Sequence, residues 1–345
     1  MKVRRANAMI RYLLVFMLIL FPLWPTRAET NQTDVDLHQE FQAGHNAITA
    51  GKYKEAIDIF KRANKLQNNS CADCYINMAI AYSRLGEFPN AISSCDKAIS
   101  VATNDQVKAT AHAMKGTAFL SLGSADGKTL KDAEAEYRSA VQLDGNEPIF
   151  RLNLGVTLLR QSRDAEATVE LQKCLSLHPV QSVADQANKL IADPRLGRES
   201  VAPDFHLTTV QGQETSLKLL RGNIVVLDFW ATWCPPCRAS VPELKDLTRK
   251  YANAKVVLIS ISADKDEKAW RNFIAKKNMD WPQYRDADNG VMKLLAVRAF
   301  PTYLVIDGDG FIKQRITGMD PQETVVHRLK ATLQAMPQLE GVAAK

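Results

Sequence analysis

Small residues recur with a fixed spacing through the first half of the chain. Two of them lie seven residues apart in each repeat, and an apolar or aromatic residue follows the first by four. The four sets are Ala56, Phe60 and Ala63; Ala91, Cys95 and Ala98; Ala133, Tyr137 and Ala140; and Ala167, Leu171 and Cys174. Because residues four and seven apart share one face of an α-helix, the spacing predicts a repeated helix that packs closely against a neighbour.

A second helix is predicted before each set. Its small residues are Gly44, Ala79, Gly116 and Gly155, and three positions later come Ala47, Tyr82, Phe119 and Leu158. Ala56 and Ala91 are 35 residues apart, and Ala133 and Ala167 are 34 apart, so the repeated unit is a helix pair. This pattern resembles the tetratricopeptide repeat, whose period is about 34 residues. A non-repetitive helical bundle is the alternative.

The helical region is predicted to span residues 37–192, with about four repeats. A longer interval of 42 residues between Ala91 and Ala133 predicts an extended loop at Gly123–Lys128, and Val183–Ile191 is predicted to cap the last repeat. Residues 193–200 contain proline, glycine and charged residues without an apolar period, which predicts a linker. Arrays of this kind offer a concave surface, so the expected role of this half is to bind a protein or a peptide.

The second half carries a pair of cysteines directly after an apolar run. Residues 224–230 are apolar except for Asp228, which predicts a buried strand, and the sequence Trp-Cys-Pro-Pro-Cys follows at 233–237. Cys234 is predicted to begin a helix, where free N–H groups and the helix dipole stabilise a thiolate. Cys237 lies on the same helix face and can resolve a mixed disulfide. Half of a zinc site is the alternative, but the only histidines of this half are His206 and His327.

The second half resembles the exported TlpA/ResA-type thioredoxins. The matching segments are Ala202–Phe205, Phe229–Arg238, Pro242–Leu244 and Phe300–Asp307. The resemblance implies an α/β thioredoxin-like fold over residues 201–337, so the predicted fold class is an all-α tetratricopeptide solenoid followed by this domain. It also implies that Pro301 is a cis-proline that faces the cysteines. The activity that it implies is thiol–disulfide exchange, with reduction of protein disulfides preferred.

The chain departs from this family at two positions. Many relatives have a glutamate three residues after the second cysteine, where this chain has Ser240, and an asparagine six residues before the first cysteine, where it has Asp228. Burial is expected to raise the pKa of Asp228, which would suit a proton acceptor for Cys237. A structural core aspartate is the alternative interpretation. Substrate preferences associated with the glutamate do not carry over.

Several residues around the cysteines are candidates for binding substrate. They are Trp233, Pro235, Pro236, Phe300 and Thr302. Trp233 is predicted either to form apolar surface beside the nucleophile or to belong to the core. No cofactor is expected besides the intramolecular disulfide, and no metal. The expected partners are a protein disulfide client and a thiol donor.

Other functions remain open at this stage. The domain could be a disulfide oxidase or isomerase, because the sequence does not give a reduction potential. The repeats could make the chain chiefly a scaffold, with the second domain a passive docking unit. Peroxide reduction is disfavoured, since Thr232 lies two residues before Cys234 rather than three.

The first 28 residues have the pattern of an export signal. They contain five basic residues and no acidic one, and four of the five precede an apolar stretch from Tyr12 to Leu23. Without these five the net charge falls from +6 to +1. The segment predicts export to the periplasm, with an uncleaved membrane anchor as the alternative. The near-neutral remainder gives no reason to expect a nucleic-acid partner.

Four further cysteines lie in the first half. Cys71 and Cys74 form a second Cys-x-x-Cys, predicted to be a local disulfide, with a second redox pair, free thiols or metal binding as alternatives. Cys95 and Cys174 occupy inward positions of the repeat and are predicted to be small core residues.

The rest of the second half has a simple alternation of elements. Residues 255–261, 302–306 and 311–316 are predicted strands, and the last two are joined by the hairpin signal Asp307–Gly310. Helices are predicted at about 235–251, at 267–277, and at 321–336 with Asp320 as the cap.

Overall fold

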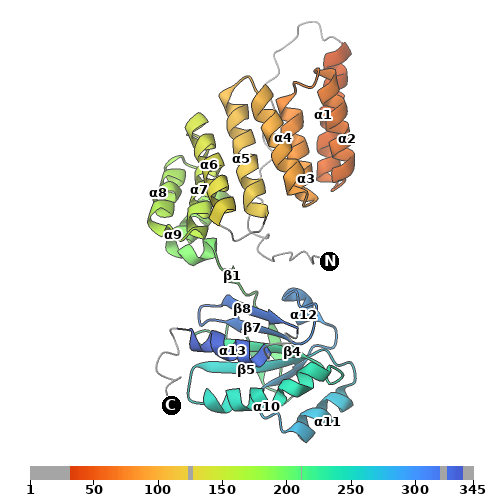
Figure 1. Cartoon of the computed structure of the whole chain (residues 1–345), viewed down its shortest axis with the longest axis vertical. Coiled ribbons are helices and arrows are strands. Elements are labelled where there is room, and N and C mark those ends of the chain that lie inside the picture. The colour runs from red at the N-terminus through yellow and green to blue at the C-terminus, as the bar shows by residue number, and fades with distance from the viewer. Residues whose placement is uncertain (1–31, 123–126, 211, 319–324, 337–345) are drawn as a thin grey trace. The chain divides into compact units, whose positions relative to one another are not determined.

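The computed structural model describes residues 32–122, 127–210, 212–318 and 325–336, and the chain divides into two compact units between Arg198 and Glu199 (Figure 1). The two predicted segments 1–28 and 123–128 lie wholly or largely outside the described residues, as does the predicted start of the last helix at 320–321. No helix of the described ranges is long and apolar enough to cross a membrane.

The first unit is a series of antiparallel helix pairs, as the spacing predicts (Figure 1). Consecutive helices contact each other along the whole series. Their bounds are α1 Gln32–Thr49, α2 Tyr53–Leu66, α3 Ala72–Arg84, α4 Phe88–Val101, α5 Asp105–Ser121, α6 Gly127–Leu143, α7 Pro148–Arg160, α8 Asp164–Ser176 and α9 Gln181–Ala192.

Glycines bring the two helices of a pair into close contact. A Cβ atom added to Gly116 of α5 would lie 3.0 Å from the Tyr137 ring of α6, and one added to Gly155 of α7 would lie 2.8 Å from Leu171 of α8. Tyr137 and Leu171 are completely buried, because each fills the space that the missing side chain leaves. The small residue of one helix and the large residue of the next are therefore matched in shape.

The end of the first unit is more structured than the prediction of a linker suggests. The helix α9 packs on the last repeat through its buried apolar residues, and a 3₁₀ turn, η2 Pro194–Gly197, follows it. Gly197 packs against Leu159, and Arg198 donates hydrogen bonds to the Asp164 carboxylate at 2.6 and 3.1 Å. Of the predicted linker at 193–200, only Glu199 and Ser200 belong to the second unit.

The second unit is built on a six-stranded mixed sheet. Its order is β1-β8-β7-β4-β5-β6, in which β5 runs parallel to both β4 and β6, and β7 is antiparallel to β4. The bounds are β1 Ser200–Val201, β4 Ile224–Trp230, β5 Val256–Ser262, β6 Gln283–Arg285, β7 Thr302–Ile306 and β8 Phe311–Thr317. A separate hairpin pairs β2 His206–Thr208 with β3 Glu214–Ser216.

Helices cover one face of this sheet. The helices α10 Pro235–Lys250, α11 Glu267–Lys277 and α13 Val325–Gln334 contribute to a core that includes Val226 and Trp230 of β4. The opposite face is covered by the β2–β3 hairpin and by the short helix α12 Gly290–Leu294. The central strand β4 is buried along its whole length, and its last residues deliver the chain to the cysteine pair.

Candidate active site

The cysteine pair lies at the start of α10, directly after the central strand. Cys234 is the residue that caps the helix, and Pro235 and Pro236 occupy its first turn. The first free donor is therefore the backbone N–H of Cys237, which donates to Cys234 Sγ at 3.3 Å. The two sulfur atoms form a disulfide, and both residues are buried, at 5% and 3% exposure.

The loop between β4 and α10 is held by a carboxylate that the sequence analysis missed. Asp264 follows β5, and it accepts hydrogen bonds from Thr232 N at 2.9 Å and from Thr232 Oγ1 at 2.6 Å. The Ser262 hydroxyl also donates to Asp264, at 2.6 Å. Since Thr232 lies two residues before Cys234, Asp264 fixes the approach of the chain to the nucleophile. An aspartate directly after a buried strand was the available signal.

An aromatic pair lies beside the cysteines. Trp233 is 62% exposed, which excludes the alternative that it belongs to the core. Its ring meets the ring of Phe300 edge to face, with the centroids 5.7 Å apart. The peptide bond between Phe300 and Pro301 is cis. Trp233 and Phe300 therefore form apolar surface next to the disulfide.

The other candidate substrate-binding residues are placed differently. Pro235 is exposed and Pro236 is half-buried, so both can contact a partner. Thr302 is only 1% exposed, and its hydroxyl donates to Ala299 O at 2.7 Å. The side chain of Thr302 therefore stabilises the turn before β7 and is not available to a substrate, which corrects the prediction for this residue.

Asp228 is a buried carboxyl in the middle of β4. Ser260 of β5 lies directly opposite it, and the Ser260 hydroxyl donates to Asp228 Oδ2 at 2.7 Å. Trp281 in turn donates to the Ser260 hydroxyl at 2.8 Å. The second oxygen, Oδ1, is buried without a hydrogen bond. Burial raises the pKa of Asp228 to about 7, against 3.8 for an ordinary aspartate, although the Ser260 hydrogen bond opposes this change.

The surroundings of Asp228 contain one further titratable side chain on the neighbouring strand β7. Tyr303 pairs with Asp228 across the two strands, and burial together with the Asp228 charge raises the pKa of Tyr303 well above its usual value of 10. Ser240 of α10 donates to Pro236 O at 3.1 Å. Alternate residues of β4 point to the same side, so Asp228 shares the face of Val226 and Trp230, and these pack in one core with Cys237.

The second cysteine pair caps a helix in the same way. Cys71 and Cys74 form a disulfide at the start of α3, and Cys74 N donates to Cys71 Sγ at 3.0 Å. The other two cysteines are buried free thiols, as predicted, and burial raises the pKa of Cys95 to about 12 and that of Cys174 to about 11. Thiols of this kind are unreactive at neutral pH. No cluster of His, Cys, Asp and Glu suited to a metal ion occurs among the described residues.

A central sheet with a disulfide at the start of a covering helix, together with a cis peptide bond at Pro301 directly before β7, defines a thioredoxin-type dithiol site. The family model for redoxins matches residues 198–333, and the model for the tetratricopeptide repeat matches residues 72–105. The thiol-disulfide oxidoreductase ResA of Bacillus thuringiensis subsp. konkukian is 34% identical over 135 residues, which cover 39% of this chain and 77% of that protein. The chain belongs to the ResA family of thiol-disulfide oxidoreductases.

Two further proteins are similar to this chain. The thioredoxin-like protein YneN of Bacillus subtilis is 34% identical over 131 residues, covering 37% of this chain and 76% of that protein. A solved thiol-disulfide oxidoreductase from Bacteroides fragilis is 29% identical, covering 38% of this chain and 98% of that one, with a TM-score of 0.34. The redoxin match lies almost wholly in the second unit, and the tetratricopeptide match lies in the first unit.

Proposed function

We propose that this chain is an exported reductase of protein disulfides, in which Cys234 attacks the client and Cys237 releases it. The observation that carries this proposal is the position of Cys234 as the cap of α10. In the reduced protein, the Cys237 N–H and the helix dipole would favour a thiolate at Cys234, because both place positive charge at the sulfur.

The proposed reaction has two exchange steps. The Cys234 thiolate attacks one sulfur of the client disulfide, and the other client sulfur leaves as a thiolate that takes a proton from solvent. The Cys237 thiol then loses its proton and attacks Cys234 Sγ, which releases the second client thiol and forms the Cys234–Cys237 disulfide. Two electrons pass to the client, and a thiol donor must return them.

Asp228 is proposed to accept the proton from Cys237. A carboxyl with a pKa of about 7 is half ionised near neutral pH, which is the condition for an efficient general base. Ser240, which replaces the family's glutamate, carries no charge, so Asp228 is the carboxyl proposed for this role. The exposed Trp233 and the half-buried Phe300 are proposed to contact apolar residues of the client around its disulfide.

Two parts of the proposal concern the rest of the chain. The tetratricopeptide repeats are proposed to recruit a protein partner, which is the usual role of such an array.

Residues 1–28 are proposed to direct the chain to the periplasm, either cleaved or retained as an anchor. Sequencing the N-terminus of the protein from the periplasmic and membrane fractions tests the second part. Recovery of the intact protein in the cytoplasm alone would reject it.

Trapping the mixed disulfide tests the assignment of the two cysteines. The Cys237→Ser variant should accumulate a covalent complex with a disulfide peptide, whereas Cys234→Ser should form none. Equal trapping by both variants, or by neither, would contradict the assigned roles. The reduction potential of the Cys234–Cys237 couple, with Cys71 and Cys74 replaced by serine, tests the direction. A reductase should lie near or below roughly −220 mV, and a value near about −120 mV would indicate an oxidase.

A further inference from the structure

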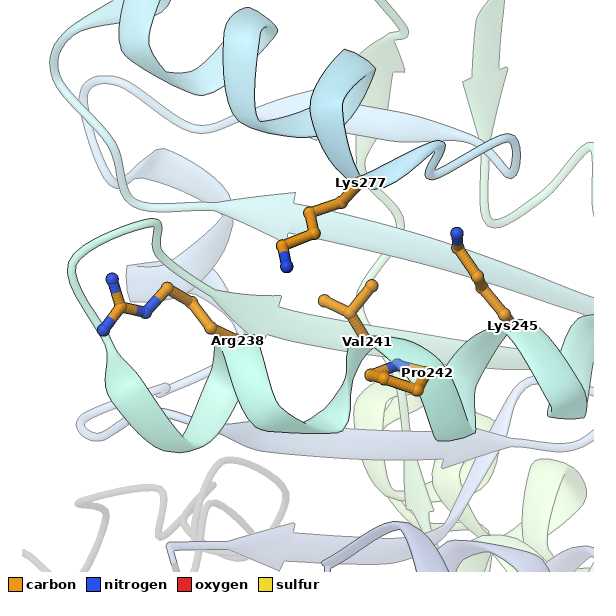
Figure 2. A pocket seen from close by; sticks show the side chains of 5 residues that line it. All are labelled: Arg238, Val241, Pro242, Lys245 and Lys277. Carbon is orange, nitrogen blue, oxygen red and sulfur yellow. The ribbon is translucent and has the colours of Figure 1, made fainter.

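A small hollow with a basic rim lies beside the active-site helix. It is lined by Arg238, Val241, Pro242 and Lys245 of α10 and by Lys277 at the end of α11, and its volume is about 140 Å³. Figure 2 shows the Lys277 side chain extending from α11 towards α10 above Val241. The buried Val241 forms an apolar floor, and Arg238, Lys245 and Lys277 contribute to the lining around it.

The positive charge of this hollow is not neutralised within the described part of the protein. None of Arg238, Lys245 and Lys277 forms an ion pair with any described residue. The two acids of α10 are engaged elsewhere: Glu243 lies 4.0 Å from Lys330 of α13, and Asp246 lies 3.5 Å from Arg249. Three like charges around one hollow repel one another, so an anion placed among them would be stabilised.

The size of the hollow limits what this anion can be. Pockets that enclose small-molecule cofactors usually have about 300–1,000 Å³, which is well above the volume found here. A single carboxylate side chain with its methylene groups against Val241 is of suitable size. The hollow also begins one helical turn after the nucleophile, because Arg238 is four residues beyond Cys234 on α10.

We propose that this hollow, defined by Arg238, Lys245 and Lys277, binds an acidic segment of the protein whose disulfide is exchanged at Cys234. The proposal rests on the proposed function and specifies the partner. A client held as a mixed disulfide on Cys234 has its neighbouring chain close to this part of α10. Acidic residues of that chain would then meet the basic rim, which favours the encounter and fixes the orientation of the client.

Two disulfide peptides test the proposal with the full-length chain. They carry the same intramolecular disulfide, flanked in one by glutamates and in the other by glutamines. Reduced protein should react with the glutamate peptide roughly tenfold faster at about 0.05 M salt, and the difference should shrink at about 0.5 M salt because the charges are screened. Equal rates for the two peptides at low salt would refute the docking surface while leaving the reductase intact.

A matched pair of lysines separates local binding from the general charge of the domain. Lys277→Glu should lower the ratio of the rate for the glutamate peptide to the rate for the glutamine peptide by roughly fivefold. Lys276→Glu makes the same change of charge at the neighbouring exposed position, which does not line the hollow, and should preserve the preference. An equal loss of the preference for the glutamate peptide in both variants would show that the preference comes from long-range attraction, and this would overturn the proposal. If neither peptide is reduced at all, the proposed function itself fails.

Discussion

Replacing Asp228 by asparagine is expected to stabilise the second unit and, in the same protein, to slow disulfide exchange. In the folded protein the pKa of Asp228 is about 7, and its usual value in an unfolded chain is 3.8. Between these two values the folded state holds a proton that the unfolded state has lost. The free energy of unfolding of the native protein therefore falls as the pH rises from about 4 to about 7, and above pH 7 the loss is complete.

The size of the effect follows from the same two values. Each tenfold difference in proton affinity corresponds to about 1.4 kcal/mol, so ionisation of Asp228 costs the folded state about 4 kcal/mol above pH 7. An asparagine cannot ionise and keeps an oxygen for the Ser260 hydroxyl. Its amide N–H group would lie where Oδ1 now has no hydrogen bond, and Tyr303 on β7 carries the neighbouring hydroxyl. If this N–H group finds no acceptor, the cost is about 1–3 kcal/mol and does not depend on pH. The prediction therefore concerns how the difference in unfolding free energy between Asp228→Asn and the native protein changes with pH, and not its value at one pH.

Denaturation by guanidinium chloride between pH 4 and pH 8.5 measures this difference. Tryptophan fluorescence reports on the second unit, because four of the five tryptophans belong to it: Trp230, Trp233, Trp270 and Trp281. The oxidised protein is used, so that the cysteines do not titrate, and Tyr303 stays neutral because its pKa is well above 10. The stability of Asp228→Asn relative to the native protein should increase by about 4 kcal/mol across this range. A difference that stays constant with pH would show that Asp228 does not have a raised pKa and would refute the argument.

The same variant has a kinetic consequence. If Asp228 accepts the proton of Cys237, the second exchange step should slow by roughly 100-fold, while the attack by Cys234 is little changed. The mixed disulfide should therefore accumulate in quenched-flow samples of Asp228→Asn. Unchanged release of the client, together with the predicted gain in stability, would assign Asp228 a structural role only.

Three further changes follow from the packing. Ser260→Ala removes the hydroxyl that opposes the effect of burial, so the pH above which client release becomes fast should move upwards, as a rate profile against pH would show. Gly155→Ala should lower the melting temperature of the helical unit by about 2–6 °C, because the added methyl group overpacks the helix pair. Gly127→Ala is the control, since a Cβ added there meets no other atom, and it should not lower the melting temperature. Circular dichroism measures both. Replacement of Cys71 and Cys74 by serine should cost the helical unit about 1–2 kcal/mol in urea denaturation, with an unchanged rate of peptide reduction; a lower rate would assign this disulfide a part in the exchange.

Local sequence patterns predicted the long elements well. The apolar run 224–230 and the helical spacing of 267–277 coincide with β4 and α11 at both ends, because each pattern is decided by the residues within it. The strands β1, β2, β3 and β6 were not predicted. Each has only two or three residues, which is too short for an alternation of buried and exposed side chains to show. The positions of β1 and β6 depend on pairing with β8 and β5 in the large sheet, and β2 and β3 pair with each other.

The site was predicted in its chemistry but not in its supporting contacts. Asp264 holds Thr232 from 32 residues away in the sequence, so no local pattern connects the two. Thr302 is among the substrate-binding residues predicted around the cysteines. In β7 the side chain of Thr302 is buried, and its hydroxyl donates to Ala299 O in the turn before the strand. Only the tertiary structure shows this contact.

The stability cost of Asp228 and the presence of Ser240 in place of the glutamate of many relatives both bear on the proton of Cys237. In a thioredoxin-type exchange the buried cysteine must lose a proton at a site from which water is largely excluded, so a base is needed there. Ser240 donates its hydroxyl hydrogen to Pro236 O and offers no carboxylate. A buried aspartate with a pKa of about 7 can take the proton near neutral pH, although its ionised form destabilises the fold. The proposed proton transfer would account for a buried aspartate in the central strand despite this cost to stability.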